Sequence, residues 1–176
     1  MGVDQLTPRQ IELQTLAKHK KNHIDLIRKG PRIERICADT IDNLVVSVTV
    51  DRLALSRQFL DAASKMQKMR PPLQRSALSR AYYGMYHAAR ALSFFSNGGD
   101  DHEAHSDLHR GIPNDFPLVE QWRNNLKDAR LRRNEADYEP YPPTDADFRA
   151  ASRAAVSNTQ QFIGAVELYL RARGCP

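Results

Sequence analysis

The stretch Ser79–Phe95, SRAYYGMYHAARALSFF, decides the fold because it combines a buried helical pattern with polar and aromatic side chains. Its apolar and small residues recur at the spacing of one helix face, which predicts that this face packs in a core. We predict a helix from Leu73 to about Ser96, ended by the turn Asn97–Gly99, whose glycines accept positive φ. The predicted core positions are Leu78, Ala81, Met85, Ala88, Leu92 and Phe95.

A second face of the same helix is polar. Residues three and four positions apart lie on one side of a helix. The residues that share this second face are Arg80, Tyr83, His87, Arg90 and Phe94. Because this face lies beside the apolar stripe and not opposite to it, we predict a polar cluster at the edge of the core.

The rest of the chain also has helical periodicity. Helices are predicted over 51–69, over 118–139 and from Thr144 to about Gly174, with a short helix near 103–109 in the polar connection 100–117. The predicted apolar stripe of the first is Leu55, Phe59, Ala62, Met66 and Met69, with Leu53, Leu60 and Ala63 beside it. The predicted inward side chains are Val119, Trp122, Leu126 and Ala129 in the second, and Phe148, Ala151, Ala155, Phe162, Val166 and Tyr169 in the third. The run LVVSVTV (44–50) favours a strand by composition. No second strand-like run exists to pair with it, so we predict helix there as well.

A basic segment precedes this bundle. Thr7 and Pro8, with Gln10, predict a helix start with a capping box, and Gly30-Pro31 predict the end of this helix near Lys29. Residues 1–35 hold eight Lys or Arg against four acids, which is +4 of the net charge of +5. We therefore predict an N-terminal helical extension over 1–40 and a helical bundle over 41–176. Such a basic segment is either a solvated helix face or a surface that attracts phosphates or an acidic partner.

Several classes of function are disfavoured by the composition. There is no apolar run near the length of a membrane span, and Cys37 and Cys175 do not make a disulfide framework. A cytoplasmic, reducing location fits best, and we expect no membrane partner. His102, His105 and His109 have no cysteine beside them, so we expect neither a metal nor another cofactor.

A further polar position lies on the predicted helix 118–139. Continuing its buried stripe beyond Ala129 by helical steps arrives at Arg133 and then Ala136. A guanidinium group at the edge of a core needs a partner, because its desolvation is costly. Arg133 should therefore meet a carboxylate, a tyrosine hydroxyl or a bound anion, and Asp137 at i+4 is the nearest carboxylate.

The two stretches together carry a family resemblance. SRAYYGMYHAARAL (79–92), followed by LRRNEADY (131–138), resembles the HEPN superfamily, most closely its small bacterial branch encoded beside a nucleotidyltransferase. His105 and then Phe116 in the connection fit the same pattern. The resemblance covers about residues 50–172. It implies an antiparallel four- to five-helix bundle of HEPN type, to which this chain adds a basic N-terminal helix.

The resemblance also implies an activity and an assembly. Many HEPN proteins are metal-independent RNases that act as toxins or in phage defence, and they dimerise with their polar motifs facing one another. Their motif is an arginine followed within a few residues by a histidine. Histidine supplies an acid or base near neutral pH, and arginine stabilises the phosphate.

The chain departs from that motif at one position. Counting from Arg133, the histidine position holds Tyr138, and a tyrosine with a pKa near 10 is a poor base at neutral pH. The candidate catalytic residues are therefore Arg133 with His87 or Tyr138. The candidate binding residues are Arg80, Tyr83, Arg90, Asn134, Asp137 and His105.

Three functions remain open at this point. The first is a HEPN module of a toxin–antitoxin or phage-defence system that binds a partner protein, a nucleotide or RNA without the standard RNase motif. The second is a metal-independent endoribonuclease, and the third is a structural helical subunit of a larger complex. The partners we expect are a second copy in a homodimer, a nucleotidyltransferase or another defence protein, and RNA.

Overall fold

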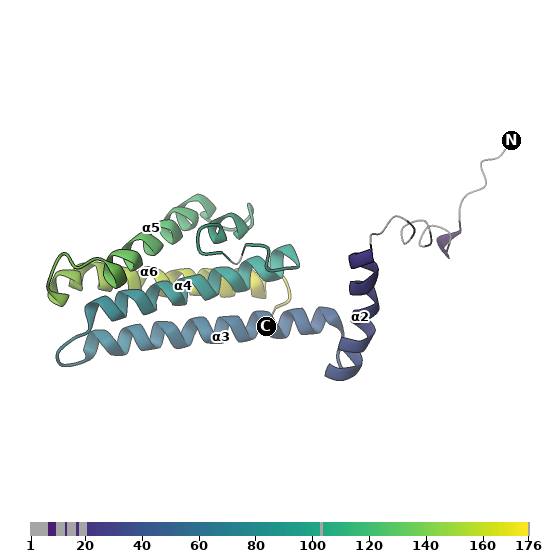
Figure 1. The fold of residues 1–176 in the computed structure, drawn as a ribbon, viewed down its shortest axis with the longest axis horizontal. Coiled ribbons are helices and arrows are strands. Elements are labelled where there is room, and N and C mark those ends of the chain that lie inside the picture. Colours follow the sequence, from purple (N-terminus) through teal and green to yellow (C-terminus); the bar gives the residue numbers. More distant parts are fainter. Residues whose placement is uncertain (1–6, 10–12, 14–16, 18–20, 103, 176) are drawn as a thin grey trace. The chain divides into compact units, whose positions relative to one another are not determined.

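The computed structural model describes residues 7–9, 13, 17, 21–102 and 104–175. These residues form helices and no strands, as the sequence predicts (Figure 1). The α-helices are α2 (Lys21–Cys37), α3 (Ile41–Lys68), α4 (Gln74–Asn97), α5 (Val119–Tyr138) and α6 (Arg149–Arg171), and the short 3-10 helices are η1 (Leu108–Gly111) and η2 (Asp145–Phe148). None of the helices in these ranges is long and apolar enough to cross a membrane.

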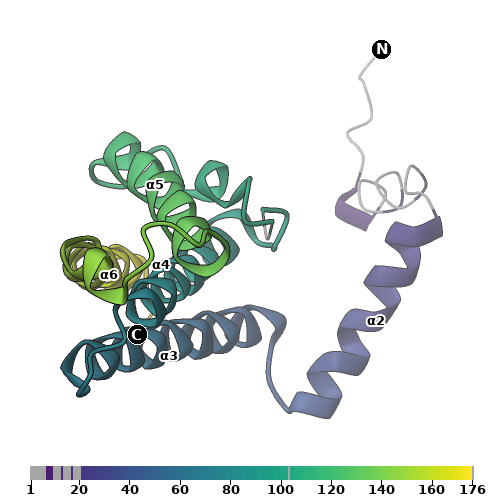
Figure 2. The same cartoon turned by 60° about the vertical axis from the view of Figure 1, so that its left-hand side comes forward.

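The chain divides into two compact units, Met1–Leu44 and Val45–Pro176. The second unit is a helical bundle in which α4 is the central helix, with α3, α5 and α6 around it (Figures 1 and 2). The predicted inward face of α4 is buried, and only its last member, Phe95, is half-buried. The buried members are Leu78, Ala81, Met85, Ala88 and Leu92.

Three helices meet at Gly84 in the middle of α4. Ser56 Oγ of α3 donates a hydrogen bond to the Gly84 carbonyl at 2.8 Å, and Thr159 Oγ1 of α6 donates one to the Ala81 carbonyl at 3.0 Å. A Cβ atom at Gly84 would lie 3.0 Å from Thr159 Cγ2 and 3.2 Å from the Ser56 carbonyl oxygen. Only a residue without a side chain therefore lets α3 and α6 approach α4 this closely.

The start of α4, the end of α5 and the start of α6 are joined by Arg75 and Asp145. Asp145 accepts hydrogen bonds from the backbone N–H groups of Gln74 and Arg75, and so caps α4 from a distant part of the chain. Arg75 in turn donates to the carbonyls of Ala136 at 3.0 Å and Glu139 at 2.8 Å, which end α5. Its guanidinium carbon lies 4.2 Å from the centre of the Phe148 ring.

The buried face of α3 is displaced from the predicted stripe toward Leu53 and Ala63, which the sequence placed beside it. The buried residues of this helix are Thr49, Leu53, Ser56 and Ala63, whereas Leu55 and Met69 are 37% and 49% exposed. Phe59, Ala62 and Met66 are half-buried. The close approach at Gly84 selects small residues for the buried side of α3, and Thr49 satisfies its hydroxyl by donating to the Val45 carbonyl at 2.8 Å.

One predicted helix boundary near the N-terminus is also wrong. α2 continues through Gly30 and Pro31 to Cys37, because these positions are on or near the helix surface, where water can satisfy the carbonyl group that Pro31 leaves without a donor. The chain turns at Ala38, with φ 52°, and α3 starts at Ile41, so the helical prediction for 44–50 is confirmed. Thr40 Oγ1 accepts from the Asn43 N–H at 3.2 Å. Gln10, the second half of the predicted capping box, lies outside the described residues.

The connections differ from prediction in detail. The short helix predicted near 103–109 is instead η1, one turn later, because Gly111 packs tightly against Ser93 of α4. Thr144 caps η2 and not α6 directly: its side chain and that of Asp147 form a reciprocal capping box. The predicted helix 118–139 corresponds to α5, with Trp122 and Leu126 buried and Val119 and Ala129 half-buried.

We expect Gly84→Ala to destabilise the fold by about 1–3 kcal/mol, because the new methyl group overpacks the junction of α3, α4 and α6. The matched control is Gly164→Ala in α6, where a Cβ atom meets nothing within 4 Å. That change should stabilise the helix by up to about 1 kcal/mol. Urea unfolding of both variants checks this; equal effects of the two substitutions would contradict a tight junction at Gly84.

Candidate functional site

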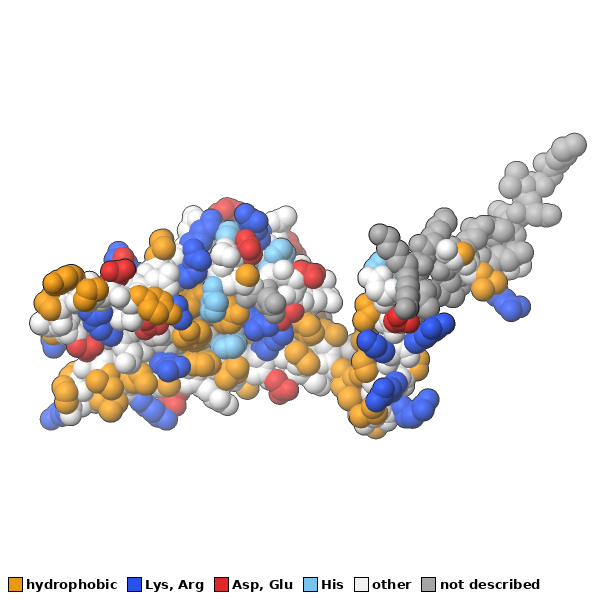
Figure 3. All heavy atoms as spheres, in the orientation of Figure 1, with side chains coloured by type: hydrophobic (Ala, Val, Ile, Leu, Met, Phe, Trp, Pro, Cys, Tyr) orange, Lys and Arg blue, Asp and Glu red, His pale blue; other side chains and the backbone are white. Residues whose placement is uncertain are grey.

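The polar face of α4 carries a cluster of rings. Tyr86 stacks on His105 with ring centres 4.2 Å apart, and His87 stacks on Phe59 of α3 at 5.2 Å. We call this the aromatic cluster, and its members are Phe59, Tyr82, Tyr83, Tyr86, His87 and His105. In Figure 3, histidine side chains lie among hydrophobic and basic ones over the middle of the bundle.

Arg133 from α5 lies against this cluster. Its Nη2 donates to the Tyr83 hydroxyl, its Nη1 donates to Asn134 Oδ1 at 3.0 Å, and its Nε lies 2.9 Å from Asp137 Oδ2. Arg133 thus has the carboxylate and the tyrosine hydroxyl that the cost of burial predicts. Its guanidinium carbon is also 5.3 Å from the centre of the Tyr83 ring and 5.3 Å from that of Tyr138.

His105 comes from the connection between α4 and η1. Its Nδ1 lies 2.6 Å from the Tyr82 hydroxyl. Partial burial and the charges of Arg133, Arg130 and Arg90 lower the pKa of His105. Burial raises the pKa of Tyr82, so this side chain stays a neutral phenol. A neutral imidazole held by a neutral phenol therefore stands beside Arg133.

His87 lies at another edge of the cluster. Burial, followed by the charges of Arg90, Arg52 and His105, lowers the pKa of His87 to about 4. His87 is therefore uncharged at neutral pH. The arginines that act on it most are Arg90 and Arg52, whereas Arg133 is the first arginine that acts on His105. Of the two histidines, His105 is thus the one placed with Arg133.

Asp100 forms a second charged network at the end of the polar face of α4 that carries Arg90. Asp100 Oδ2 accepts hydrogen bonds from Arg52 Nη2 at 2.8 Å and from Arg90 Nη2. Burial opposes the charge of Asp100, but the two guanidinium groups outweigh it and lower its pKa. Arg52 also lies over the ring of Phe94, at 4.5 Å. This network fixes Arg90 at the edge of the cluster.

The remaining predicted residues are placed as follows. Arg80 is exposed, with its guanidinium carbon 5.7 Å from the centre of the Phe59 ring. Tyr138 is 69% exposed, and its ring centre lies 5.3 Å from the guanidinium carbon of Arg133. Ser79 Oγ donates to Asp137 Oδ2 at 3.1 Å. This hydrogen bond links the stretch LRRNEADY (131–138), which we call the late motif, to α4.

Sequence reasoning missed four contributors. Phe59 was assigned to the core, and Tyr82, Tyr86 and Arg130 were not singled out. Tyr82 and Tyr86 are an i, i+4 pair on α4, which was a usable signal that both reach the same neighbour. Nothing in the spacing of residues 100–117 indicated that His105 would reach the Tyr82 hydroxyl.

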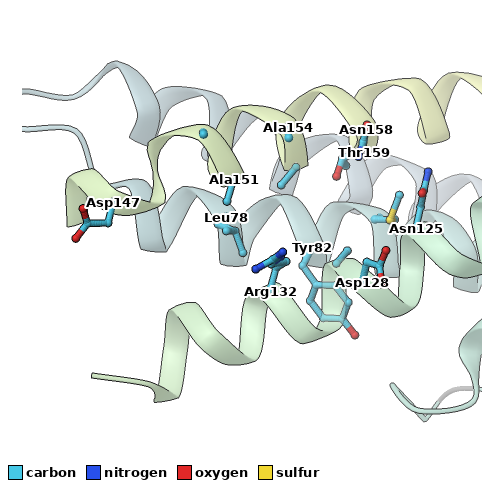
Figure 4. A pocket seen from close by; sticks show the side chains of 14 residues that line it. Leu78, Tyr82, Asn125, Asp128, Arg132, Asp147, Ala151, Ala154, Asn158 and Thr159 are labelled. Atoms are coloured by element: carbon cyan, nitrogen blue, oxygen red, sulfur yellow. The ribbon is translucent and has the colours of Figure 1, made fainter. Parts of the chain in front are cut away.

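A groove of about 560 Å³ lies between α4, α5 and α6, bordered by Leu78, Arg132 and Asn158 among others (Figure 4). It shares one residue, Tyr82, with the aromatic cluster. Arg132 lines this groove while Arg133, the next residue, faces the aromatic cluster. No histidine is among the residues that line the groove. In the part of the chain that the structure describes, no group of three or more His, Cys, Asp or Glu is suited to hold a metal.

His87 makes the free energy of unfolding depend on pH in the acid range. Its pKa of about 4 in the folded chain lies below the 6.5 of an ordinary histidine. The unfolded chain therefore binds more protons between these values, and folding is favoured as the pH rises through them. We expect an imidazole titration by NMR with a midpoint near 4, and a shallower pH dependence of the unfolding free energy in His87→Gln. A midpoint near 6.5 would show that the ring is not desolvated.

Comparison with known proteins agrees with the resemblance. The HEPN domain family matches residues 50–172, which include nearly all of the bundle that carries the aromatic cluster. No curated protein matches the chain. The matched segment contains both α4 and the late motif on α5, and the helical architecture agrees with it. The chain therefore belongs to the HEPN domain family.

Proposed function

We propose that this chain is a HEPN module that binds single-stranded RNA at the aromatic cluster, without the standard RNase motif, as part of a toxin–antitoxin or phage-defence system. The family supports the type of system, and the site supports the ligand. RNA offers phosphates for cations and unstacked bases for aromatic faces. The cluster provides both within one surface.

One observation carries the proposal. Arg80 and Arg130 flank the aromatic cluster, and neither pairs with a carboxylate among the described residues. Arg80 lies over Phe59, and the charge of Arg130 acts on Tyr82 and His105. Two guanidinium groups without acidic partners, beside two neutral histidines, make a surface that favours a polyanion.

Arg133 carries a positive charge and contacts the aromatic cluster directly. Its carboxylate partner, Asp137, is one turn further along the same helix and also accepts a hydrogen bond from Ser79 Oγ. A phosphate can replace Asp137 on the guanidinium group with a bidentate contact, while Ser79 remains a donor to the displaced carboxylate. Tyr83 holds Arg133 in place during this exchange.

The chemistry at the late motif supports binding over cleavage. Tyr138 stands where the family motif has histidine, and its side chain is exposed. Its exposed ring is suited to stack on a base. In this proposal Tyr138 is a binding residue, although the sequence also made it a catalytic candidate.

A second candidate function rests on His105. A neutral imidazole beside Arg133 has the two groups that metal-independent RNA cleavage needs, an acid or base and a phosphate-stabilising cation. The sequence pointed to His87 for this role, but the arginine charges that lower the pKa of His87 are those of Arg90 and Arg52. The endoribonuclease alternative therefore uses Arg133 and His105.

The basic unit Met1–Leu44 supplies a candidate docking arm. α2 carries Arg28, Arg32 and Arg35, with exposed Leu26 and Ile36. Basic and apolar side chains on one helix fit an acidic protein surface. We propose that the nucleotidyltransferase or other defence protein expected beside this chain binds there.

We expect Arg133→Ala to weaken binding of a labelled single-stranded RNA of about 12 nucleotides roughly tenfold. Fluorescence anisotropy in EDTA measures this at several salt concentrations. The matched control is Arg132→Ala, because Arg132 is exposed, pairs with Glu135 at 3.0 Å and faces the groove on the other side of α5. It should change the affinity little.

The basic N-terminal unit needs its own control. Replacing Arg28, Arg32 and Arg35 by Ala tests whether α2 supplies the affinity. If these changes abolish binding while Arg133→Ala has no effect, the aromatic cluster is not the RNA site. If the wild-type chain binds no RNA at low salt, the structural-subunit function gains support and the RNA proposal is wrong.

The two candidate functions separate in one further experiment. The binding proposal predicts that labelled RNA stays intact during incubation with the chain in EDTA. Cleavage that is lost in Arg133→Ala and in His105→Gln, but not in Arg132→Ala, would establish the endoribonuclease instead. Denaturing gels of the RNA give the readout.

A further inference from the structure

The groove between α5 and α6 results from where large and small side chains stand on these helices. At one end, Trp122 of α5 packs on Phe162 of α6 with ring centres 5.1 Å apart. At the other end, Phe148 clusters with Ala136 of α5 and Leu78 of α4. Between these ends, α6 lines the groove mainly with alanines, which are Ala150, Ala151, Ala154 and Ala155. Because methyl groups are too short to fill the space between two helices, the groove stays open.

The floor of the groove is apolar and already formed. It consists of Leu78, Tyr82 and Met85 of α4, whose side chains the bundle buries. His105 Nδ1 lies 2.6 Å from the Tyr82 hydroxyl and holds that ring in place. A ligand therefore meets a fixed apolar surface and does not have to reorganise the core.

The dimensions of the groove fit a helix. From Ala150 to Asn158 its lining follows α6 for about 12 Å, at about 1.5 Å per residue. Two turns of a second helix cover this length and bring two or three apolar side chains onto the floor. The alanines allow the backbone of such a helix to approach α6 closely. Figure 4 shows Asp147 at one end of the groove, and Asn125 and Asn158 toward the other.

The rim of the groove is acidic, although the chain as a whole has a net charge of +5. Asp128 and Asp147 line it, and neither has a Lys or Arg within ion-pair distance among the residues that the structure describes. Asp147 accepts hydrogen bonds from Thr144, which is neutral. The guanidinium group that lines the groove, that of Arg132, pairs with Glu135 at 3.0 Å. Lysine or arginine along the edge of a bound helix would therefore find carboxylates here.

We propose that this groove binds an amphipathic helix of a partner protein, with its apolar face on Leu78, Tyr82 and Met85 and its basic edge beside Asp128 and Asp147. The inference goes beyond the proposed function and does not rest on it. RNA is disfavoured in the groove because the free carboxylates repel phosphates, whereas the aromatic cluster is flanked by arginines. The occupant also differs from the partner proposed for α2, which has an acidic surface.

A designed peptide on the full chain tests the groove. The probe is a fluorescein-labelled peptide of about 14 residues, with leucine along one helical face and lysine along the other. Its control has the same composition but an order that leaves no apolar face. Fluorescence anisotropy should show at least tenfold tighter binding of the amphipathic peptide. If that peptide does not bind, or binds no better than its control, the proposal is wrong.

A side chain that fills the groove locates the binding. Ala154 is exposed and lines the groove, so Ala154→Leu should weaken peptide binding roughly tenfold and leave the helix content by circular dichroism unchanged. The matched control is Gln160→Leu, because Gln160 is exposed on the same helix but does not line the groove. It should bind like the wild type. Equal affinities of wild type and Ala154→Leu would place the peptide elsewhere and overturn the proposal.

A charge reversal tests the basic edge and does not change the floor. Asp128→Lys should weaken binding of the lysine peptide about fivefold, since it replaces an attraction at the rim by a repulsion. Asp51→Lys is the control, because it changes the net charge by the same amount at an exposed position of α3 outside the groove. Its effect should be less than about twofold. If both variants weaken binding equally, the peptide responds to overall charge and the acidic rim does not select it.

Discussion

The close approach of three helices at Gly84 is the constraint on which the rest of the structure depends. Because α3 and α6 contact the same turn of α4, the backbone carbonyls of Ala81 and Gly84 accept hydrogen bonds from Thr159 and Ser56. A side chain at Gly84 itself has no room between these two helices. The tyrosines and the histidine around Gly84 contact α5, the connection after α4 and Phe59 of α3. The junction that holds the bundle together also builds the aromatic cluster.

The cluster is chemically unusual because it gathers cations around groups that burial keeps neutral. Desolvation raises the pKa of Tyr82 and lowers that of His87, and the arginine charges lower the pKa of His87 and His105 further. The site thus keeps its positive charge on guanidinium groups, which do not titrate near neutral pH. Proteins that bind single-stranded nucleic acids contact the phosphates with guanidinium groups and stack the bases on flat rings. This is the physical reason to place RNA here.

The sequence predicted the helical bundle and the buried face of α4, because both rest on local helical spacing. For Arg133 it left a carboxylate, a tyrosine hydroxyl and a bound anion open as partners, and the structure has Asp137 and Tyr83 there. It could not predict which side of α3 is buried, since both sides carry apolar residues and the choice depends on the approach of α4 at Gly84. The path of α2 through Pro31 was missed because a proline on an exposed helix costs less than in a packed one. The sequence predicts His105 as a binding residue, but its contact with Tyr82 depends on how an irregular connection folds back, which spacing does not encode.

The central claim is that the aromatic cluster, and not the larger groove or the basic α2, receives RNA. The most direct measurement is an NMR titration of the full chain with a short single-stranded RNA, following the imidazole signals of His87 and His105 and the guanidinium signal of Arg133. The account predicts that these three signals shift together, while Asn158 in the groove between α5 and α6 stays unchanged. Shifts confined to that groove or to α2, with His105 and Arg133 unaffected, would contradict it.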